Sequence, residues 1–202
     1  MTGWQVAKLD EIPRAGKRWI PIRKHFDGRA FGVNAWVAEA EGEDVIGEHI
    51  EEGTGHEELY FVARGAATFA LDGESVHAPA GTYVFLPDPT TQRHATADEP
   101  GTTVLSFGGW RDRAFQVSGW ESRMRATTIR EDDPQRAREL YEEGLASDQD
   151  SKWANYDLAC WHALYGDEEE ARRLLGRAIE LGGDEVREHA AKDPDLENLR
   201  AT

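Results

Sequence analysis

Cysteine is almost absent from this 202-residue chain, and the single cysteine, Cys160, cannot form an internal disulfide. A fold held together by internal disulfides is therefore excluded. Cys160 lies among helix-forming residues beside Leu158 and Trp161, where a thiol is usually buried and unreactive. We expect it to have a structural role.

Positive charge is also scarce. The chain has 23 Lys and Arg against 39 Asp and Glu, which gives a formal net charge of −16 and a pI near 4.8. Binding to phosphate groups requires clustered basic side chains, so this composition disfavours nucleic acid and anionic membranes as partners.

Long hydrophobic runs and familiar catalytic motifs are missing too. No apolar segment approaches the ~20 residues that cross a bilayer, and residues 1–9 lack the apolar core of a secretion signal, so we expect a cytoplasmic protein. No nucleophile elbow, phosphate-binding glycine loop or paired-cysteine motif is evident. The catalytic residues, if any exist, stay unassigned.

The character of the chain changes near Trp120. Residues 1–120 hold nearly all the strand-like runs, whereas residues 128–202 are rich in Ala, Glu, Arg and Leu with helical periodicity. At 22.6 kDa, the chain is long enough for two small domains with their own cores. We predict a β domain with an N-terminal arm over 1–120 and an all-α domain over 128–202.

The strand-like runs after Gly32 are short and separated by Gly, Pro and Asp-Gly turns, as in an all-β sandwich or barrel. Asp72-Gly73 predicts a tight hairpin, because glycine readily supplies the positive φ that such turns need. In the run that begins at Glu57, alternation places Glu58, Tyr60 and Val62 on one face, which we expect to point inward. A buried carboxylate then needs a hydrogen bond or a cation beside it.

Two short motifs in this part resemble those of the cupin superfamily. Glu58 and Gly65 are separated by six residues, and Gly81 and Pro87 by five. The resemblance covers about residues 30 to 110 and implies a small jelly-roll β-barrel. Because many cupins dimerise, it also implies a homodimer.

The chain departs from the cupin pattern at the usual histidines. The first pair would fall on Glu52 and Thr54, or on Glu51 and Gly53, and the second motif has Pro89, Gln92 and Thr96 in place of its glycine, histidine and asparagine. Of the usual metal ligands only Glu58 is retained.

Two interpretations of the barrel interior stay open. In the first, nearby histidines rebuild a site for zinc, iron, manganese or nickel from His49, His56, Glu58 and His94. In the second, no metal binds and a small molecule occupies a pocket lined by Glu58, Tyr60, Val62, Gln92 and His94. A regular strand points Arg93 away from Gln92 and His94, so we expect Arg93 to be a surface cation.

The first thirty residues contain Trp4, Trp19 and the run Ile20-Pro21-Ile22. They indicate an edge strand or arm that covers the barrel or pairs with another subunit.

In the C-terminal part a pattern recurs with an offset of 34 residues. It matches Asp133 with Asp167, Ala137 with Ala171, Leu140 with Leu174, and Tyr141 with Leu175. That period resembles tetratricopeptide repeats, in which paired helices stack because neither buries its apolar stripe alone. Gly166 followed by Asp167 predicts the end of one helix and the cap of the next.

Three functions are consistent with these features. The first is a cupin-type protein that binds or senses a small molecule and contacts a protein partner through its helices. The second is a metal-dependent cupin enzyme of the oxygenase or isomerase type. The third is a non-catalytic interaction scaffold.

Overall fold

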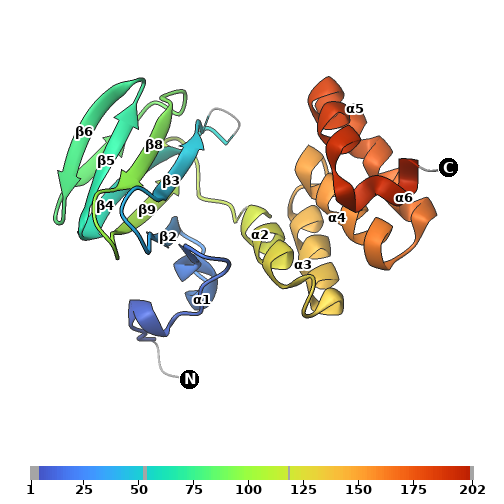
Figure 1. Ribbon diagram of the computed structural model, residues 1–202, viewed down its shortest axis with the longest axis horizontal. Helices are drawn as coiled ribbons and strands as arrows, with labels where there is room; N and C mark the ends of the chain where they lie inside the picture. The colour runs from blue at the N-terminus through green and yellow to red at the C-terminus, as the bar shows by residue number, and fades with distance from the viewer. Residues whose placement is uncertain (1–4, 52–53, 118, 201–202) are drawn as a thin grey trace. The chain divides into compact units, whose positions relative to one another are not determined.

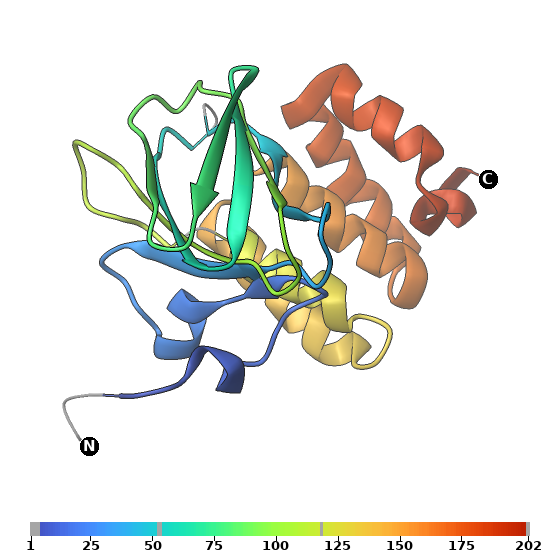
Figure 2. The same cartoon turned by 60° about the vertical axis from the view of Figure 1, so that its left-hand side comes forward.

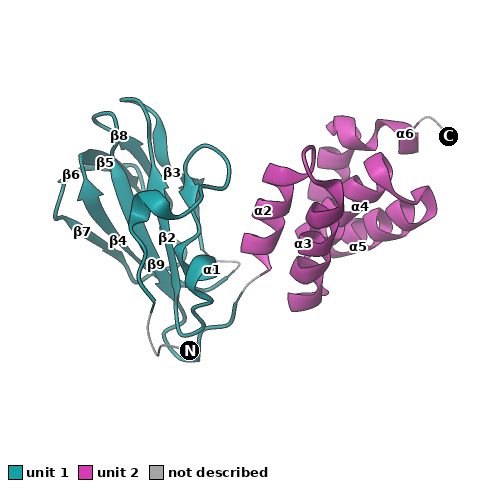
Figure 3. Ribbon diagram, turned by 90° about the horizontal axis from the view of Figure 1, so that it is seen from below, with its two compact units in different colours: residues 1–117 teal, residues 118–202 magenta. Residues whose placement is uncertain are grey.

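The computed structural model describes residues 5–51, 54–117 and 119–200, so Trp4, Glu52 and Gly53 lie outside the described residues. The chain separates into two compact units, residues 1–117 and 118–202 (Figure 3). Strands dominate the first unit and helices make up the second (Figure 1). The expectation of a strand-rich part followed by a helical part is confirmed; the strands form antiparallel sheets, and the first helix of the second unit begins at Trp120, ahead of residue 128.

The first unit contains two antiparallel sheets, with strand orders β1-β2-β9-β4-β7 and β3-β8-β5-β6. Their strands are β1 (Trp19–Ile20), β2 (Gly32–Val37), β3 (Asp44–His49), β4 (Glu57–Arg64), β5 (Ala66–Leu71), β6 (Glu74–Pro79), β7 (Tyr83–Leu86), β8 (Arg93–Ala97) and β9 (Thr103–Gly109). Two short helices, η1 (Leu9–Glu11) and α1 (Ile22–Phe26), precede β2.

A single hydrophobic core joins the two sheets. Tyr60, Val62 and Val104 enter it from the five-stranded sheet, and Phe69 and Ala95 enter it from the four-stranded sheet. All five side chains are at most 1% exposed. Alternation along β4, β5 and β8 therefore places every second residue of these strands in this core.

The predicted hairpin at Asp72-Gly73 is present between β5 and β6, where Leu71 pairs with Glu74. Both turn residues have positive φ, 50° for Asp72 and 87° for Gly73. This is the backbone conformation of a two-residue turn that matches the twist of the strands.

The N-terminal segment lies on its own sheet (Figure 2). Trp19 pairs with Trp36 of β2, and Ile12 and Ile20 pack against Ala35 on the face of β2 that points away from the core. Of the two roles expected for this arm, the structure shows it covering its own chain.

The second unit consists of α2 (Trp120–Ile129), α3 (Pro134–Ser147), α4 (Lys152–Tyr165), α5 (Glu168–Lys192), η2 (Pro194–Leu196) and α6 (Glu197–Arg200). The side chains of Asp133 and Asp167 cap α3 and α5 by accepting backbone N–H bonds. Gly183, with φ of 59°, interrupts the helical conformation inside α5.

Cys160 is buried in this unit, as expected, and burial raises the pKa of its thiol. Among the described residues, no helix combines the length and the apolar character that crossing a bilayer requires.

Candidate functional site

Glu58 stands near the start of β4 and points between the two sheets. It pairs with Leu86 of β7 on one side and with Gly108 of β9 on the other, and its side chain is 12% exposed. The hydroxyl of Tyr60 donates a hydrogen bond of 2.5 Å to Glu58 Oε2. Burial, with the Glu58 charge beside it, raises the pKa of Tyr60 well above 10, so the phenol stays protonated and remains a donor.

The four-stranded sheet brings a cation to the same carboxylate. Arg93, the first residue of β8, is fully buried, and its Nη1 lies 3.6 Å from Glu58 Oε2. The expectation of a surface cation at Arg93 is therefore wrong. Ala95 and Ala97 are core residues of the same strand, so alternation turns Arg93 inward with them.

His49, which pairs with Arg93 across β3 and β8, also faces Glu58. Its Nε2 lies 3.7 Å from Glu58 Oε2 and 3.6 Å from Glu51 Oε1. Its Nδ1 lies 2.7 Å from the Gly47 carbonyl oxygen. Since that oxygen can only accept, Nδ1 carries the proton, and Nε2 of the neutral ring presents a lone pair to the carboxylates.

The surroundings shift the pKa of His49 upward. Burial alone would lower it, but the Glu58 and Glu51 carboxylates and the Gly47 carbonyl outweigh burial and raise the pKa above its ordinary 6.5. His56 behaves in the opposite way, because burial and, more weakly, Arg113 lower its pKa below 6.5 against the charges of Glu51 and Glu58.

We therefore expect the two imidazoles of the metal-free protein to titrate on opposite sides of pH 6.5, measurable by NMR. A raised pKa in the folded state stabilises the fold at pH below the unfolded value, and this stabilisation is lost as pH rises through the folded pKa. His49→Gln should remove that pH dependence from thermal unfolding curves. Curves for wild type and variant that stay parallel from pH 5 to 8 would contradict the assignment.

His56 lies beside the site under an aromatic cover. Its ring centroid is 4.4 Å from that of Trp110 and 6.2 Å from that of Phe115. A Cβ added to Gly108 would lie 3.7 Å from His56 Nδ1 and 3.9 Å from Glu58 Cγ, so both side chains flank this glycine. His56 Nε2 is buried and has no hydrogen-bond partner among the described residues.

Other residues predicted for the pocket point elsewhere. His94 faces outward, with Nε2 2.7 Å from Asp44 Oδ1, and the exposed Gln92 donates to Glu48 at 2.7 Å. The expectation that Gln92 and His94 point inward is therefore wrong. Along β8, Arg93, Ala95 and Ala97 point into the core, so Gln92 and His94 point away from it. Val62 is fully buried in the core that both sheets share.

Asn34, Glu51 and Arg93 belong to this end of the unit but were not predicted as site residues. Asn34 pairs with Ser106 of β9, which in turn pairs with Tyr60, so the three residues form one row on the inner face. Asn34 Oδ1 and two nitrogens of Arg93, Nε and Nη1, are buried without hydrogen-bond partners among the residues that the structure describes. The one sequence feature that indicates an inward-facing Arg93 is its two-residue spacing from Ala95 and Ala97, two small apolar residues suited to the core.

The donor set His49, Glu51 and Glu58 has the chemistry of a transition-metal site. The ligand atoms lie within 4.8 Å of one another, and the Nδ1 contact of His49 fixes the tautomer that a metal ion requires. These three residues would hold a divalent ion, whereas His56 and His94 do not join the group. Arg93 opposes such an ion, because its positive charge lies against the same oxygen, Glu58 Oε2.

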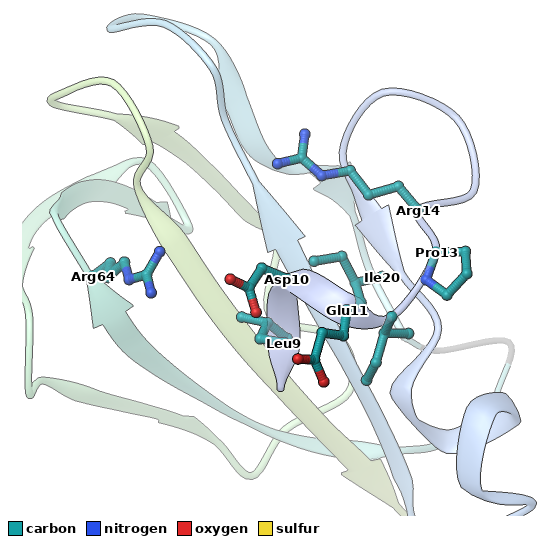
Figure 4. Close-up of a pocket in the computed structure, with 8 residues that line it drawn as sticks. Leu9, Asp10, Glu11, Pro13, Arg14, Ile20 and Arg64 are labelled. Carbon is teal, nitrogen blue, oxygen red and sulfur yellow. The ribbon is translucent and has the colours of Figure 1, made fainter. Parts of the chain in front are cut away.

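Two hollows lie outside this group. One, of about 240 Å³, lies between the N-terminal segment and the end of β4, with Arg14 and Arg64 on opposite sides of it (Figure 4). The other, of about 440 Å³, is in the helical unit and includes Asn155 and Arg177 in its lining. Neither is lined by Glu58, His49 or Arg93.

No family model matches the chain, and no curated protein matches it significantly. Among solved structures, it is similar to a cupin protein from Bacteroides fragilis, at 17% identity over 58% of this chain and 93% of that chain, with a TM-score of 0.45. It is also similar to a sugar phosphate isomerase of the cupin superfamily from Silicibacter pomeroyi, at 19% identity over 54% of this chain and 83% of that chain, with a TM-score of 0.42. A third similar structure is an RmlC-like cupin protein from Desulfovibrio desulfuricans, at 22% identity over 41% of this chain and 74% of that chain, with a TM-score of 0.35. Identity at this level assigns neither a ligand nor an activity to this chain.

Proposed function

We propose that the protein is a cupin-type small-molecule-binding or sensing protein, with its site at Glu58 in a jelly-roll β unit. Three observations support it. Glu58 occupies its motif position, two facing sheets bring His49 and Arg93 to its carboxylate, and polar atoms of Arg93, Asn34 and His56 at this end are buried without a hydrogen-bond partner among the described residues. Buried polar atoms without partners are costly, and a bound polar molecule would satisfy them.

The main observation in favour of this proposal is the fully buried Arg93 beside Glu58. Tyr60, His49 and Arg93 all approach the same oxygen, Glu58 Oε2, so the carboxylate is neutralised by the protein itself. Arg93 Nε has no hydrogen-bond partner among the described residues, and Nη1 reaches Glu58 only through the 3.6 Å ion pair. A metal-free site that recognises oxygen atoms of a small molecule fits this arrangement better than a cation site does.

Native mass spectrometry of the purified protein, together with elemental analysis, tests the proposal. We expect a retained small molecule that is released on denaturation, with substoichiometric metal. Glu58→Gln should reduce the retained fraction, and Glu57→Gln, which alters a partly exposed carboxylate paired with Arg111, should leave it unchanged. Equal retention by both variants would contradict the assignment to Glu58.

The second candidate is a metal-dependent enzyme, which the His49, Glu51 and Glu58 group favours. A bound ion would polarise oxygen atoms of a substrate or activate water. In that case, purified protein should contain zinc, iron, manganese or nickel near one equivalent per chain. His49→Ala and Glu58→Gln should each lose the metal, while His94→Ala should keep it because His94 faces outward. Loss in the His94 variant would contradict the ligand set.

For the helical unit, we propose a tetratricopeptide-like protein-interaction role. Residues that are 34 positions apart have the same structural role in the two helices. Asp133 and Asp167 each cap a helix, and Leu140 and Leu174 are each at most 1% exposed. If the whole chain is only an interaction scaffold, capture of a partner will survive substitution of Glu58. The charge of −16 leads us to expect protein and small-molecule partners and not nucleic acid or membranes, and we propose that the protein acts in the cytoplasm.

A further inference from the structure

The hollow between the N-terminal segment and the end of β4 combines apolar side chains with a balanced set of charges (Figure 4). Leu9, Ile12 and Ile20 form the apolar part of its lining. Ile12 and Ile20 are only 5% and 3% exposed, because they also pack against β2. The charged part consists of two carboxylates and two guanidinium groups, from Asp10, Glu11, Arg14 and Arg64. In a chain with a net charge of −16, the charges of this lining cancel.

Two interruptions of regular structure form the hollow. Pro13 ends η1 because the residue before a proline avoids the helical conformation, and Ile12 is accordingly extended, with φ of −81° and ψ of 120°. At the end of β4, strict alternation from Val62 would turn Arg64 into the core. A register shift between Val62 and Arg64 interrupts the pairing with β9, and Arg64 lines the hollow instead. The irregular pairing therefore supplies a cation to the hollow.

Only part of this charge is used within the protein. Arg14 and Glu11 form ion pairs of 3.0 and 3.5 Å with a glutamate and a lysine outside the lining. The side chains of Asp10 and Arg64, in contrast, form no ion pair or hydrogen bond among residues 5–51, 54–117 and 119–200. Figure 4 shows the Asp10 carboxylate and the Arg64 guanidinium group turned toward each other. The described lining thus contains one anion and one cation that still need a counter-charge.

We propose that this hollow binds a small zwitterion, an α-amino acid with a branched aliphatic side chain. Arg64 binds its carboxylate, since a guanidinium group can donate two parallel hydrogen bonds to a carboxylate. Asp10 accepts hydrogen bonds from its ammonium group. The aliphatic side chain packs against Leu9, Ile12 and Ile20. This site is independent of the function proposed above for the β unit.

Charge and size both favour a zwitterion over simpler ligands. Asp10 and Glu11 repel an anion such as phosphate, and Arg64 repels a diamine. A hollow of about 240 Å³ has room for about eight water molecules, and valine and leucine have about the same number of non-hydrogen atoms. Because Asp10 and Arg64 are exposed to water, which screens both contacts, we expect a Kd of about 0.1–1 mM.

Titration of the full chain with three probes that share one side chain tests the proposal. L-Leucine carries both charges, isocaproate lacks the ammonium group, and isoamylamine lacks the carboxylate. In two-dimensional ¹H–¹⁵N NMR spectra, leucine should shift the amide signals of Ile12, Ile20 and Arg64 until the site is saturated. Each analogue should bind about 10-fold more weakly, because one charged contact is lost.

Neutral variants assign the two contacts. Arg64→Gln should weaken leucine binding about 10-fold and abolish the preference for leucine over isoamylamine, since the carboxylate then has no cation. Asp10→Asn should abolish the preference for leucine over isocaproate. Arg29→Gln and Asp27→Asn are the matched controls, because they alter an exposed Asp–Arg pair of 3.2 Å outside the lining. Both controls should leave leucine binding unchanged.

Glu58→Gln should also leave leucine binding unchanged, since Glu58 does not line the hollow. Circular dichroism should show that the Arg64 and Asp10 variants remain folded, because both side chains are exposed. The absence of saturable shifts up to about 20 mM leucine would overturn the proposal. So would an analogue that binds as tightly as leucine, an affinity that neither variant changes, or a loss of binding in Glu58→Gln.

Discussion

Arg93→Met is expected to lower the free energy of unfolding by about 3–5 kcal/mol, the loss typical of removing one partner from a buried ion pair. Arg93 is fully buried, and the carboxylate of Glu58 that it faces is only 12% exposed. Without the guanidinium, Glu58 keeps the Tyr60 hydroxyl and His49 as neighbours but loses its permanent cation. The uncompensated charge destabilises the fold because little of the carboxylate is exposed to water.

Urea denaturation at pH 7 measures this effect, with Arg111→Met as the matched control. Arg111 is 68% exposed and forms a 3.2 Å ion pair with Glu57, so its loss should change stability by less than about 1 kcal/mol. Adding Glu58→Gln to Arg93→Met should restore part of the stability, because a neutral amide needs no counter-charge. If the Arg93 and Arg111 variants lose the same amount, the buried pair is not the cause.

Gly65→Ala is the second substitution for which we expect a large effect. Gly65 has φ of +69°, and an added Cβ would lie 2.5 Å from Thr102 Oγ1 and 2.9 Å from Thr102 Cα. Thr102 cannot easily give way, because its hydroxyl donates to the Ala66 and Glu99 carbonyls. Backbone strain and steric overlap together should lower stability by roughly 2–5 kcal/mol.

Gly81→Ala separates these two causes. Gly81 is the other motif glycine and has φ of +91°, but an added Cβ there would meet nothing within 4 Å. It should therefore show the backbone strain alone, about 1–2 kcal/mol. Thermal unfolding of the two variants gives the comparison, and equal losses would mean that contact with Thr102 contributes nothing.

Local patterns predicted many elements correctly because they act over a few residues. The Asp72-Gly73 turn follows from the need for positive φ, and the cap at Asp167 follows from unpaired N–H groups at a helix start. Alternation placed Glu58 and Tyr60 on the inner face correctly. Alternation gave the wrong faces for Arg93 and His94, because the inner face of β8 was assigned to the polar Gln92 and His94. The core residues of this strand are Ala95 and Ala97.

The amino-acid sequence by itself determined that this protein has a strand-rich part followed by helices, and that a carboxylate at position 58 enters the β unit. Only the tertiary structure decided what surrounds that carboxylate. His49 and Arg93 belong to the other sheet and lie 9 and 35 residues away in the chain. Local periodicity carries no information about which strands of two facing sheets meet, since their packing depends on contacts between distant segments.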